Sequence, residues 1–254
     1  PGNSQQFLGM LGMHGTYEAN NAMHDCDLMI NIGARFDDRI TGKIDEFSPK
    51  SKKIHIDIDP SSINKNVKVD IALVGDVKAV LENLVIALKQ KHPDFENSNK
   101  QKIAAWWSQI ENWRKKNSLG YVNSKEIIKP QFAVQRLYEL TKAQDTFITT
   151  EVGQHQMWAS LFFDAIHPGT FFSSTGLGTM GWGFPAAIGA KTARPDVNVV
   201  DIAGDGSFNM TENSLATSVL EGLPVIVFLI NNFSLGMVAQ WQRTFYEKRM
   251  IGID

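Results

Sequence analysis

The sequence contains a single cysteine, Cys26. One thiol cannot form an intramolecular disulfide or a cysteine-built zinc site, which indicates a reducing compartment. Cys26 is expected to pack as a small hydrophobic residue.

The sequence lacks a marked excess of positive or negative charge, since it contains 25 Lys and Arg and 27 Asp and Glu. The net charge of -2 offers no basic surface for nucleic acid or an anionic membrane. The longest apolar run, Leu223 to Ile230, contains Pro224 and falls far short of the ~20 residues of a membrane helix. We expect a soluble protein whose partners are small molecules or protein, with no nucleic acid and no membrane.

The sequence also lacks an initiator methionine and a charged-then-apolar leader. Its first residues, Pro-Gly-Asn-Ser-Gln-Gln, resemble the middle of a loop, so we expect a fragment. A chain of 254 residues, of which 43% are hydrophobic, can nevertheless fill two cores.

Short β-branched runs alternate with helical segments along the chain, which predicts an α/β fold with two Rossmann-like parallel-sheet domains. Helices are expected at 77–91 and 130–141 from apolar residues at helical spacing and from a proline at the first turn. Strands this apolar suit sheets buried on both faces. The expected strands are Leu28 to Ile32, Lys53 to Ile58, Thr146 to Thr150, Val197 to Ile202 and Val225 to Ile230.

The composition changes between the two α/β regions, where Pro93 and an Asn/Ser/Lys-rich stretch precede an aromatic helix. This predicts domains at 1–92 and 129–254 with a helical interdomain linker at 93–128. The tryptophans of the helix could stack on a cofactor, but three in one helix favour packing against a neighbouring domain. They are Trp106, Trp107 and Trp113.

The strongest local motif is Gly204-Asp205-Gly206, which follows one predicted strand, while Asn231-Asn232 follows the next. Ligands of open parallel sheets bind at strand carboxyl ends, and glycines let the backbone approach a phosphate. Asp205 and Asn232 could supply the oxygen ligands that Mg²⁺ prefers. A helix expected over 207–221 would add amide donors. Alone, Gly-Asp-Gly could equally be a turn motif.

Four further segments accompany this motif: Val152 to Trp158 (VGQHQMW), Gly176 to Gly181 (GLGTMG), Leu235 to Gln242 (LGMVAQWQ) and Gly33 to Arg39 (GARFDDR). Together they resemble the catalytic large subunits of the acetohydroxyacid (acetolactate) synthase family, in its FAD-containing biosynthetic form. The resemblance implies decarboxylation of pyruvate with thiamine diphosphate and Mg²⁺. The two-carbon unit then joins pyruvate or 2-ketobutyrate, giving 2-acetolactate or 2-aceto-2-hydroxybutyrate for branched-chain amino acid biosynthesis.

The resemblance also implies roles for single residues. Asp205, Asn232 and the backbone carbonyl of Ser234 would bind the metal. Met180 would bend the thiamine, Arg39 would hold the second ketoacid's carboxylate, and Trp241, with Met237 and Val238, would shape its pocket, although Trp241 could instead be a core residue. Residues implied to contact thiamine diphosphate are Gly153, Gln154, His155, Gly178, Met180, Gly204, Asp205, Gly206, Ser207, Asn232 and Met237.

The N-terminal region resembles the middle domain of the same family, which binds FAD in a structural role. An α/β domain without flavin, and a flavin oxidoreductase such as pyruvate oxidase, are the alternatives. Residues implied to lie along the flavin are Leu11, Gly12, Met13, His14, Gly33, Ala34, Arg35, Asp37, Arg39, Asp57, Ile58, Asp76 and Val77.

Family members assemble as homodimers or homotetramers and bind a small regulatory subunit. Their pyrimidine domain has no counterpart before Pro1, so the fragment alone is expected to be inactive. The implied location is cytoplasmic in a bacterium and organellar in a eukaryote. A noncatalytic paralogue is the competing class, against which the metal pair, Arg39 and Trp241 argue.

Overall fold

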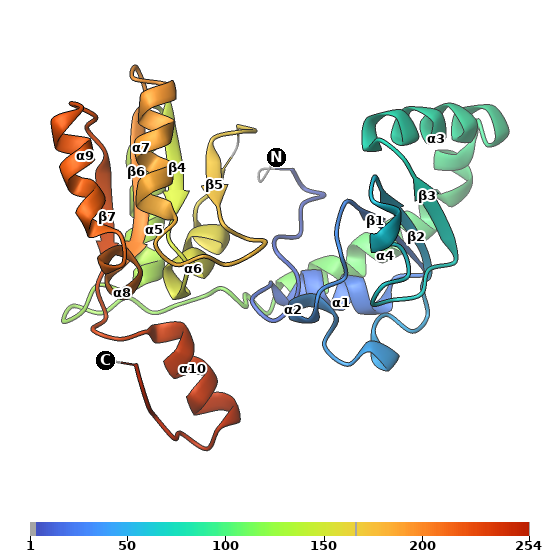
Figure 1. The fold of residues 1–254 in the computed structure, drawn as a ribbon. Coiled ribbons are helices and arrows are strands. Elements are labelled where there is room, and N and C mark those ends of the chain that lie inside the picture. Colours follow the sequence, from blue (N-terminus) through green and yellow to red (C-terminus); the bar gives the residue numbers. More distant parts are fainter. Residues whose placement is uncertain (1–3, 166, 254) are drawn as a thin grey trace. The chain divides into compact units, whose positions relative to one another are not determined.

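The computed structural model describes residues 4–165 and 167–253, so Pro1, on which the expectation of a fragment depends, lies outside them. The chain forms two compact units, Leu8–Gly120 and the stretch from Tyr121 onward with the segment ending at Phe7. Each contains one all-parallel sheet with helices (Figure 1), which confirms the predicted α/β class with two parallel sheets. Among the described residues, no helix combines the length and hydrophobicity needed to cross a bilayer.

The C-terminal unit is built on a sheet of order β5-β4-β6-β7. Three of its strands are the predicted ones to within a few residues, while β5 was not predicted. Its elements are α5 Pro130–Thr141, β4 Thr146–Thr150, α6 Gln154–Phe162, β5 Phe171–Ser173, α7 Gly183–Ala193, β6 Asn198–Gly204, α8 Asp205–Asn209, η3 Glu212–Ser214, α9 Leu215–Leu220, β7 Ile226–Ile230 and α10 Gly236–Phe245.

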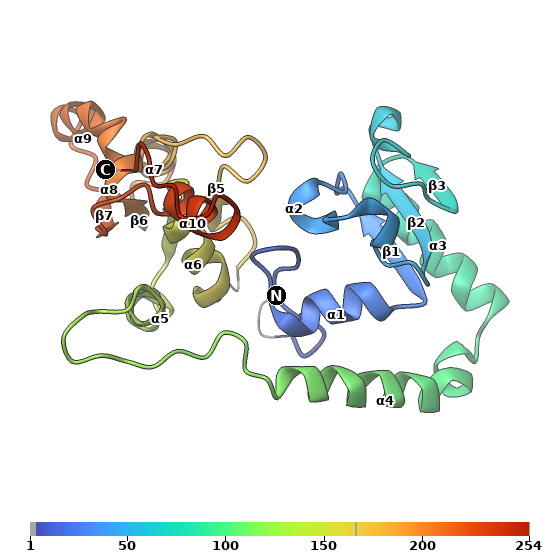
Figure 2. The ribbon, with the colours of Figure 1, turned by 90° about the horizontal axis from the view of Figure 1, so that it is seen from below.

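Helices cover both faces of this sheet. Ile148 and Ile202 pack with Ala159 of α6, and Val199 packs with Ala187 of α7. Because successive residues of a strand point to opposite faces, α6 and α7 lie on opposite sides, as Figure 2 shows. Burial on both faces is therefore confirmed for the central strands β4 and β6.

The prediction of one helix over 207–221 is wrong. The segment forms the five-residue α8, the 3₁₀ turn η3 and the six-residue α9. Asn209, Thr211 and Asn213 fall in this segment, and such side chains compete with a helix for backbone hydrogen bonds. A helix as short as α8 has little macrodipole, so its electrostatic attraction for an anion is smaller than that expected from one long helix.

The N-terminal unit contains a three-stranded sheet of order β1-β2-β3, with α3 against β2. Strand β3 was not predicted, whereas β1 and α3 begin and end where the sequence pattern places them. Its elements are α1 Tyr17–Asp25, β1 Leu28–Ile32, α2 Asp38–Thr41, η1 Ile44–Glu46, β2 Lys52–Asp57, η2 Pro60–Ser62, β3 Ile71–Val74, α3 Val77–Lys91 and α4 Phe95–Arg114.

One face of β1 is not buried, so the expectation of burial on both faces is wrong for this strand. Leu28, Ile30 and Ile32 remain 49%, 43% and 44% exposed. The alternate residue Met29 packs against the cluster of Phe36 and Phe47. Within the described residues, β1 is thus a strand with one buried face, despite a sequence as apolar as that of β6.

The aromatic helix α4 packs beside α1 within the N-terminal unit (Figure 2). Its Ile110 and Trp113 are buried, and the Trp106 and Trp113 rings meet edge to face with centroids 5.6 Å apart. These contacts lie within the N-terminal unit, so the predicted packing of the tryptophans against a neighbouring domain stays a prediction. The chain passes from one unit to the other at Gly120, and the predicted domain limits 1–92, 93–128 and 129–254 stay a prediction.

We expect Ile202→Ala to lower the free energy of unfolding of the C-terminal unit by about 2–5 kcal/mol, because Ile202 is fully buried and the truncation leaves a cavity. Urea unfolding followed by circular dichroism measures this loss. Leu220→Ala is the matched control, since Leu220 is 83% exposed and its truncation should change the free energy by less than about 0.5 kcal/mol. Equal effects of the two substitutions would contradict the assignment of the core.

Candidate functional site

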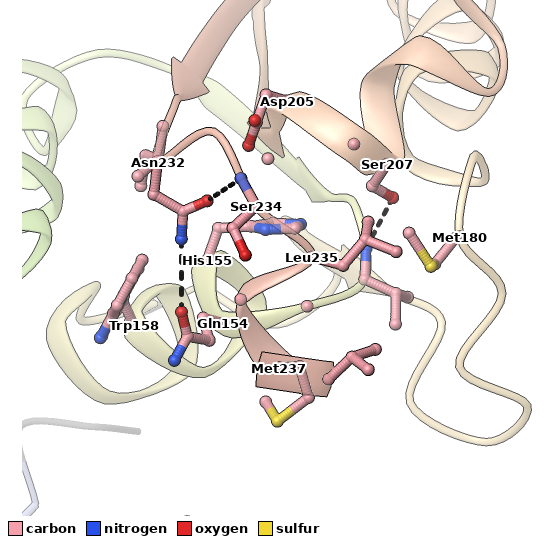
Figure 3. A pocket seen from close by; sticks show the side chains of 17 residues that line it. Gln154, His155, Trp158, Met180, Asp205, Ser207, Asn232, Ser234, Leu235 and Met237 are labelled. Carbon is pink, nitrogen blue, oxygen red and sulfur yellow. Dashed lines mark hydrogen bonds between the residues drawn. The ribbon is translucent and has the colours of Figure 1, made fainter. Parts of the chain in front are cut away.

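One pocket lies where three parallel strands of the C-terminal unit end. The register pairs Thr150 with Ile202, and Gly204 with Ile230, so the segments leaving β4, β6 and β7 emerge at the same edge (Figure 3). The pocket is lined by Val152, Gly153, Gln154, His155, Trp158, Met180, Gly204, Asp205, Gly206, Ser207, Ile230, Asn232, Ser234, Leu235, Gly236, Met237 and Val238.

Asp205, Asn232 and Ser234 are among the residues of this lining whose side chains bear oxygen. The Asn232 side chain accepts a hydrogen bond from the Ser234 amide at 3.2 Å and donates to Gln154 Oε1 at 3.4 Å (Figure 3). Buried Ser234 Oγ has no hydrogen-bond partner among the described residues. Among the described residues, no group of three or more His, Cys, Asp or Glu side chains could by itself hold a metal ion. One carboxylate with neutral oxygens suits a Mg²⁺ ion that keeps phosphate and water ligands.

The glycines of the pocket are required by close packing. A Cβ on Gly204 would lie 2.4 Å from His155 Nδ1, and one on Gly206 would lie 2.5 Å from Leu235 Cδ2. Gly153, with φ 152°, would place a Cβ 2.8 Å from His155 Cε1. A larger residue at any of the three would displace a side chain that lines the pocket.

His155 is buried at the N-terminal turn of α6. Burial lowers its pKa to about 4, against the opposing influences of the Glu151 backbone carbonyl and the Asp205 charge. The imidazole is therefore neutral near pH 7, and its Nε2 has no partner among the described residues. A neutral ring can offer a ligand a hydrogen bond without adding a buried charge.

Met180 lies in a turn between two glycines with left-handed backbone. Gly178 has φ 65° and Gly181 has φ 78°, conformations that side chains other than glycine rarely adopt. Met180 lines the pocket, whereas Gly178, also predicted as a cofactor contact, does not. The glycines thus set the path of the turn, and Met180 supplies the contact surface.

A second pocket lies along α10 and the segment after it. Its lining consists of Met237, Val238, Trp241, Gln242, Tyr246, Arg249 and Ile251. Trp241 is partly buried and its ring lies 5.0 Å from that of Phe245, so its role as a pocket wall, against the alternative of a core residue, stays a prediction.

Both pockets depend on α10. Met237 and Val238 line both of them. Gln154 Nε2 of α6 donates to Gln240 Oε1 of α10 at 2.9 Å, which fastens the two helices together. Arg249 also lines the second pocket, although it lies in no motif and no sequence pattern predicts it.

Two fully buried carboxylates lie near the pocket. Glu151, the first residue after β4, accepts hydrogen bonds from the Gly181 amide, the Phe184 amide and Ser207 Oγ at 2.7, 3.0 and 2.7 Å. Asp201 of β6 accepts one from Thr149 Oγ1 at 2.9 Å. Burial, and next the charge of Glu151, raise the pKa of Asp201 to about 7, while the Thr149 hydrogen bond opposes the shift. Neither carboxylate lies in a sequence motif that indicates a role at the site.

The predicted flavin residues gather at the carboxyl edge of the N-terminal sheet. The Gly33 amide donates to the Ile56 carbonyl at 2.8 Å and the Gly75 amide to the Asp57 carbonyl at 3.0 Å, which continues the parallel ladder past the strand ends. The Met13 amide donates to the Arg39 carbonyl at 2.8 Å, which places residues 11–14 beside α2. This arrangement is one that accommodates a dinucleotide.

Several of these residues also have partners within the unit. Asp37 caps α2 and pairs with Arg35 at 2.7 Å, while Asp76 caps α3. Arg39 pairs with Asp38 at 2.8 Å. Arg39 belongs to the N-terminal unit and is not among the residues that line either pocket described above.

Both units match models of known protein families. Residues 151–254 match the family model "Thiamine pyrophosphate enzyme, C-terminal TPP binding domain", and residues 1–84 match "Thiamine pyrophosphate enzyme, central domain". The chain is 46% identical over 249 residues to the acetolactate synthase large subunit of Haemophilus influenzae and to the acetolactate synthase isozyme 3 large subunit of Escherichia coli, covering 98% of this chain and 43% of each relative. It is 46% identical over 255 residues to acetolactate synthase of Mycobacterium leprae, covering 100% of this chain and 40% of the relative. The chain thus spans about two fifths of the length of these relatives.

We expect Asp201→Asn to stabilise the protein increasingly as the pH rises. The pKa of Asp201 is about 7 in the folded protein and 3.8 ordinarily. Between about pH 4 and pH 7 the carboxyl is therefore ionised in the unfolded chain but still protonated in the folded one, so the wild-type protein loses stability as the pH rises. The advantage of the variant should grow by roughly 2–3 kcal/mol between pH 5 and pH 8. Urea unfolding at both pH values measures it, and a pH-independent difference would contradict the buried proton.

Proposed function

This chain belongs to the thiamine pyrophosphate enzyme family, and from that membership we propose that the whole protein is an acetolactate synthase. It would decarboxylate pyruvate and join the two-carbon unit to pyruvate or 2-ketobutyrate, giving 2-acetolactate or 2-aceto-2-hydroxybutyrate. The products would enter branched-chain amino acid biosynthesis. The observation that supports this most directly is that four segments far apart in the sequence line one pocket. They lie within residues 152–158, at Met180, within 204–207 and within 230–238.

The pocket would hold the diphosphate end of thiamine diphosphate through a metal ion. Asp205 and Asn232 would ligate Mg²⁺ with the Ser234 carbonyl, in keeping with a donor set of one carboxylate and neutral oxygens. Backbone amides of the glycine turns would donate to phosphate oxygens, and the neutral His155 ring would lie beside them without adding a positive charge.

Bound thiamine diphosphate supplies the nucleophilic carbon for loss of CO₂ and transfer of the remaining two-carbon unit. The residues of this chain would orient that chemistry. Met180 would press on the thiamine rings from the turn between Gly178 and Gly181, a task that suits a flexible apolar thioether. The apolar lining from Leu235 and Val238 would keep water away from the reacting centre.

The second pocket would receive the ketoacid acceptor. Trp241 would form its aromatic wall, with Met237 and Val238 between the acceptor and the cofactor. Arg39 would bind the acceptor's carboxylate, because the motif Gly33 to Arg39 resembles that of the family. A guanidinium is well suited to bind a carboxylate. Trp241 would therefore set the preference between pyruvate and the longer 2-ketobutyrate.

The N-terminal unit would bind FAD in a structural role, since the net reaction has no redox step. Gly33, Asp57 and Asp76 at the carboxyl edge of its sheet support this assignment. A flavin oxidoreductase is the second candidate, because FAD bound at this edge could serve either a structural role or a redox reaction.

The partners follow from the relatives. Because two relatives are named large subunits, we propose that this protein also pairs with a small regulatory subunit and assembles as a homodimer or homotetramer. A bacterial source, as in these relatives, would make the enzyme cytoplasmic.

The function is tested by acetolactate formation from pyruvate by the full-length protein, with thiamine diphosphate, Mg²⁺ and FAD each omitted in turn. We expect synthesis to stop without any one of the three. Acetate formation with reduction of the flavin would indicate the oxidase instead, and synthesis that does not need flavin would remove FAD from the assignment.

We expect Trp241→Leu to reduce the preference for 2-ketobutyrate over pyruvate by about tenfold, because the longer acceptor loses its aromatic contact while pyruvate does not. Competition between the two ketoacids, with both products quantified, measures the ratio. Trp241→Phe keeps an aromatic wall and should lie between the variant and wild type. An unchanged product ratio in Trp241→Leu would remove Trp241 from the specificity pocket.

A further inference from the structure

We propose that Glu151 is a positioning residue, whose buried carboxylate holds the Met180 turn and Ser207 in the arrangement that binds thiamine diphosphate. The inference rests on the proposed cofactor of the pocket. Glu151 itself is not among the residues that line the pocket, so it would act through its neighbours.

The carboxylate of Glu151 joins three segments that are distant in sequence. Oε2 accepts from the Gly181 amide at 2.7 Å and from Ser207 Oγ at 2.7 Å, while Oε1 accepts from the Phe184 amide at 3.0 Å. Gly181 directly follows Met180, and both Met180 and Ser207 line the pocket. One side chain thus links the end of β4, the turn before α7 and the start of α8.

Ser207 extends this linkage along the pocket wall. Its Oγ also accepts from the Gly181 amide at 3.2 Å. A further bond comes from the Val152 amide at 3.4 Å (Figure 3). Val152 is a further lining residue. A shift of the carboxylate would therefore move lining residues from three segments together, namely Val152, Met180 and Ser207.

The site is built for a carboxylate. Each of the three groups directed at Glu151 is an N–H or O–H donor, and the Phe184 amide belongs to the N-terminal turn of the 11-residue α7, where negative charge is favoured. A Cβ on Gly183 would lie 2.6 Å from the Glu151 amide nitrogen, so this glycine lets α7 press onto the strand end. Glutamine would have the same shape but would turn an NH₂ group toward one set of donors.

Asp201 provides a matched comparison, because it is equally buried but touches no lining residue by a hydrogen bond. Its Oδ1 accepts only from Thr149, and its Oδ2 has no partner in the described part of the chain. Replacing either carboxylate by its amide removes one buried acid. Only the replacement at Glu151 disturbs groups attached to the pocket.

The test is thiamine diphosphate binding to the full-length protein in the presence of Mg²⁺, measured by titration calorimetry on wild type, Glu151→Gln and Asp201→Asn. We expect Glu151→Gln to bind at least tenfold more weakly and Asp201→Asn to bind within twofold of wild type. The cofactor should also raise the Tm of Glu151→Gln by less than it raises that of wild type. A merely structural role would lower the Tm with and without cofactor by the same amount.

The outcomes separate the inference from the function on which it rests. Wild type that binds no thiamine diphosphate overturns both, whereas wild-type binding with an equal affinity in Glu151→Gln overturns the inference alone. If Glu151→Gln does not fold, Ser207→Ala takes its place, since it removes the hydroxyl between Glu151 and the Val152 amide. At least threefold weaker binding is then expected, and wild-type affinity in that variant would refute the linkage.

Discussion

The parallel register of β4, β6 and β7 is the constraint on which the rest of the site depends. A slip of one residue would turn Ile148 and Ile202 from the α6 side of the sheet to the α7 side, and the buried cores on both faces prevent it. With this register, the three strands end at one edge. The loops that follow them therefore converge on one pocket, although Val152, Asp205 and Asn232 are far apart in sequence.

The end of β4 differs in chemistry from its middle. Apolar Phe147 and Ile148 lie in the middle of the strand, whereas Thr149, Thr150 and the following Glu151 are polar and all fully buried. Burying such polar groups is costly unless each finds a partner. Thr149 and Glu151 do so through Asp201 and through the amides before and within α7. The carboxyl end of β4 is thus a buried polar layer directly before the lining residue Val152, and the apolar middle of the strand supports it.

Local patterns in the sequence predicted most of this architecture. The β-branched runs indicated β1, β4 and β7, and the motif residues Asp205, Asn232, His155 and Met180 do line one pocket. Strand β5 has only three residues, too few for a periodic signal. Tertiary contacts decided the remainder. The exposed face of β1 depends on what packs there, and the carboxylate of Glu151 has meaning only once Gly181 and Ser207 lie beside it.

The placement of α10 between two pockets has an evolutionary consequence. Met237 and Val238 face both pockets, so a substitution at either position changes both of them at once. Trp241, Tyr246 and Arg249 line only the second pocket. Changes of substrate preference during evolution are therefore expected mainly in the later turns of α10 and in the segment after it. The first turn of the helix is also constrained by the first pocket.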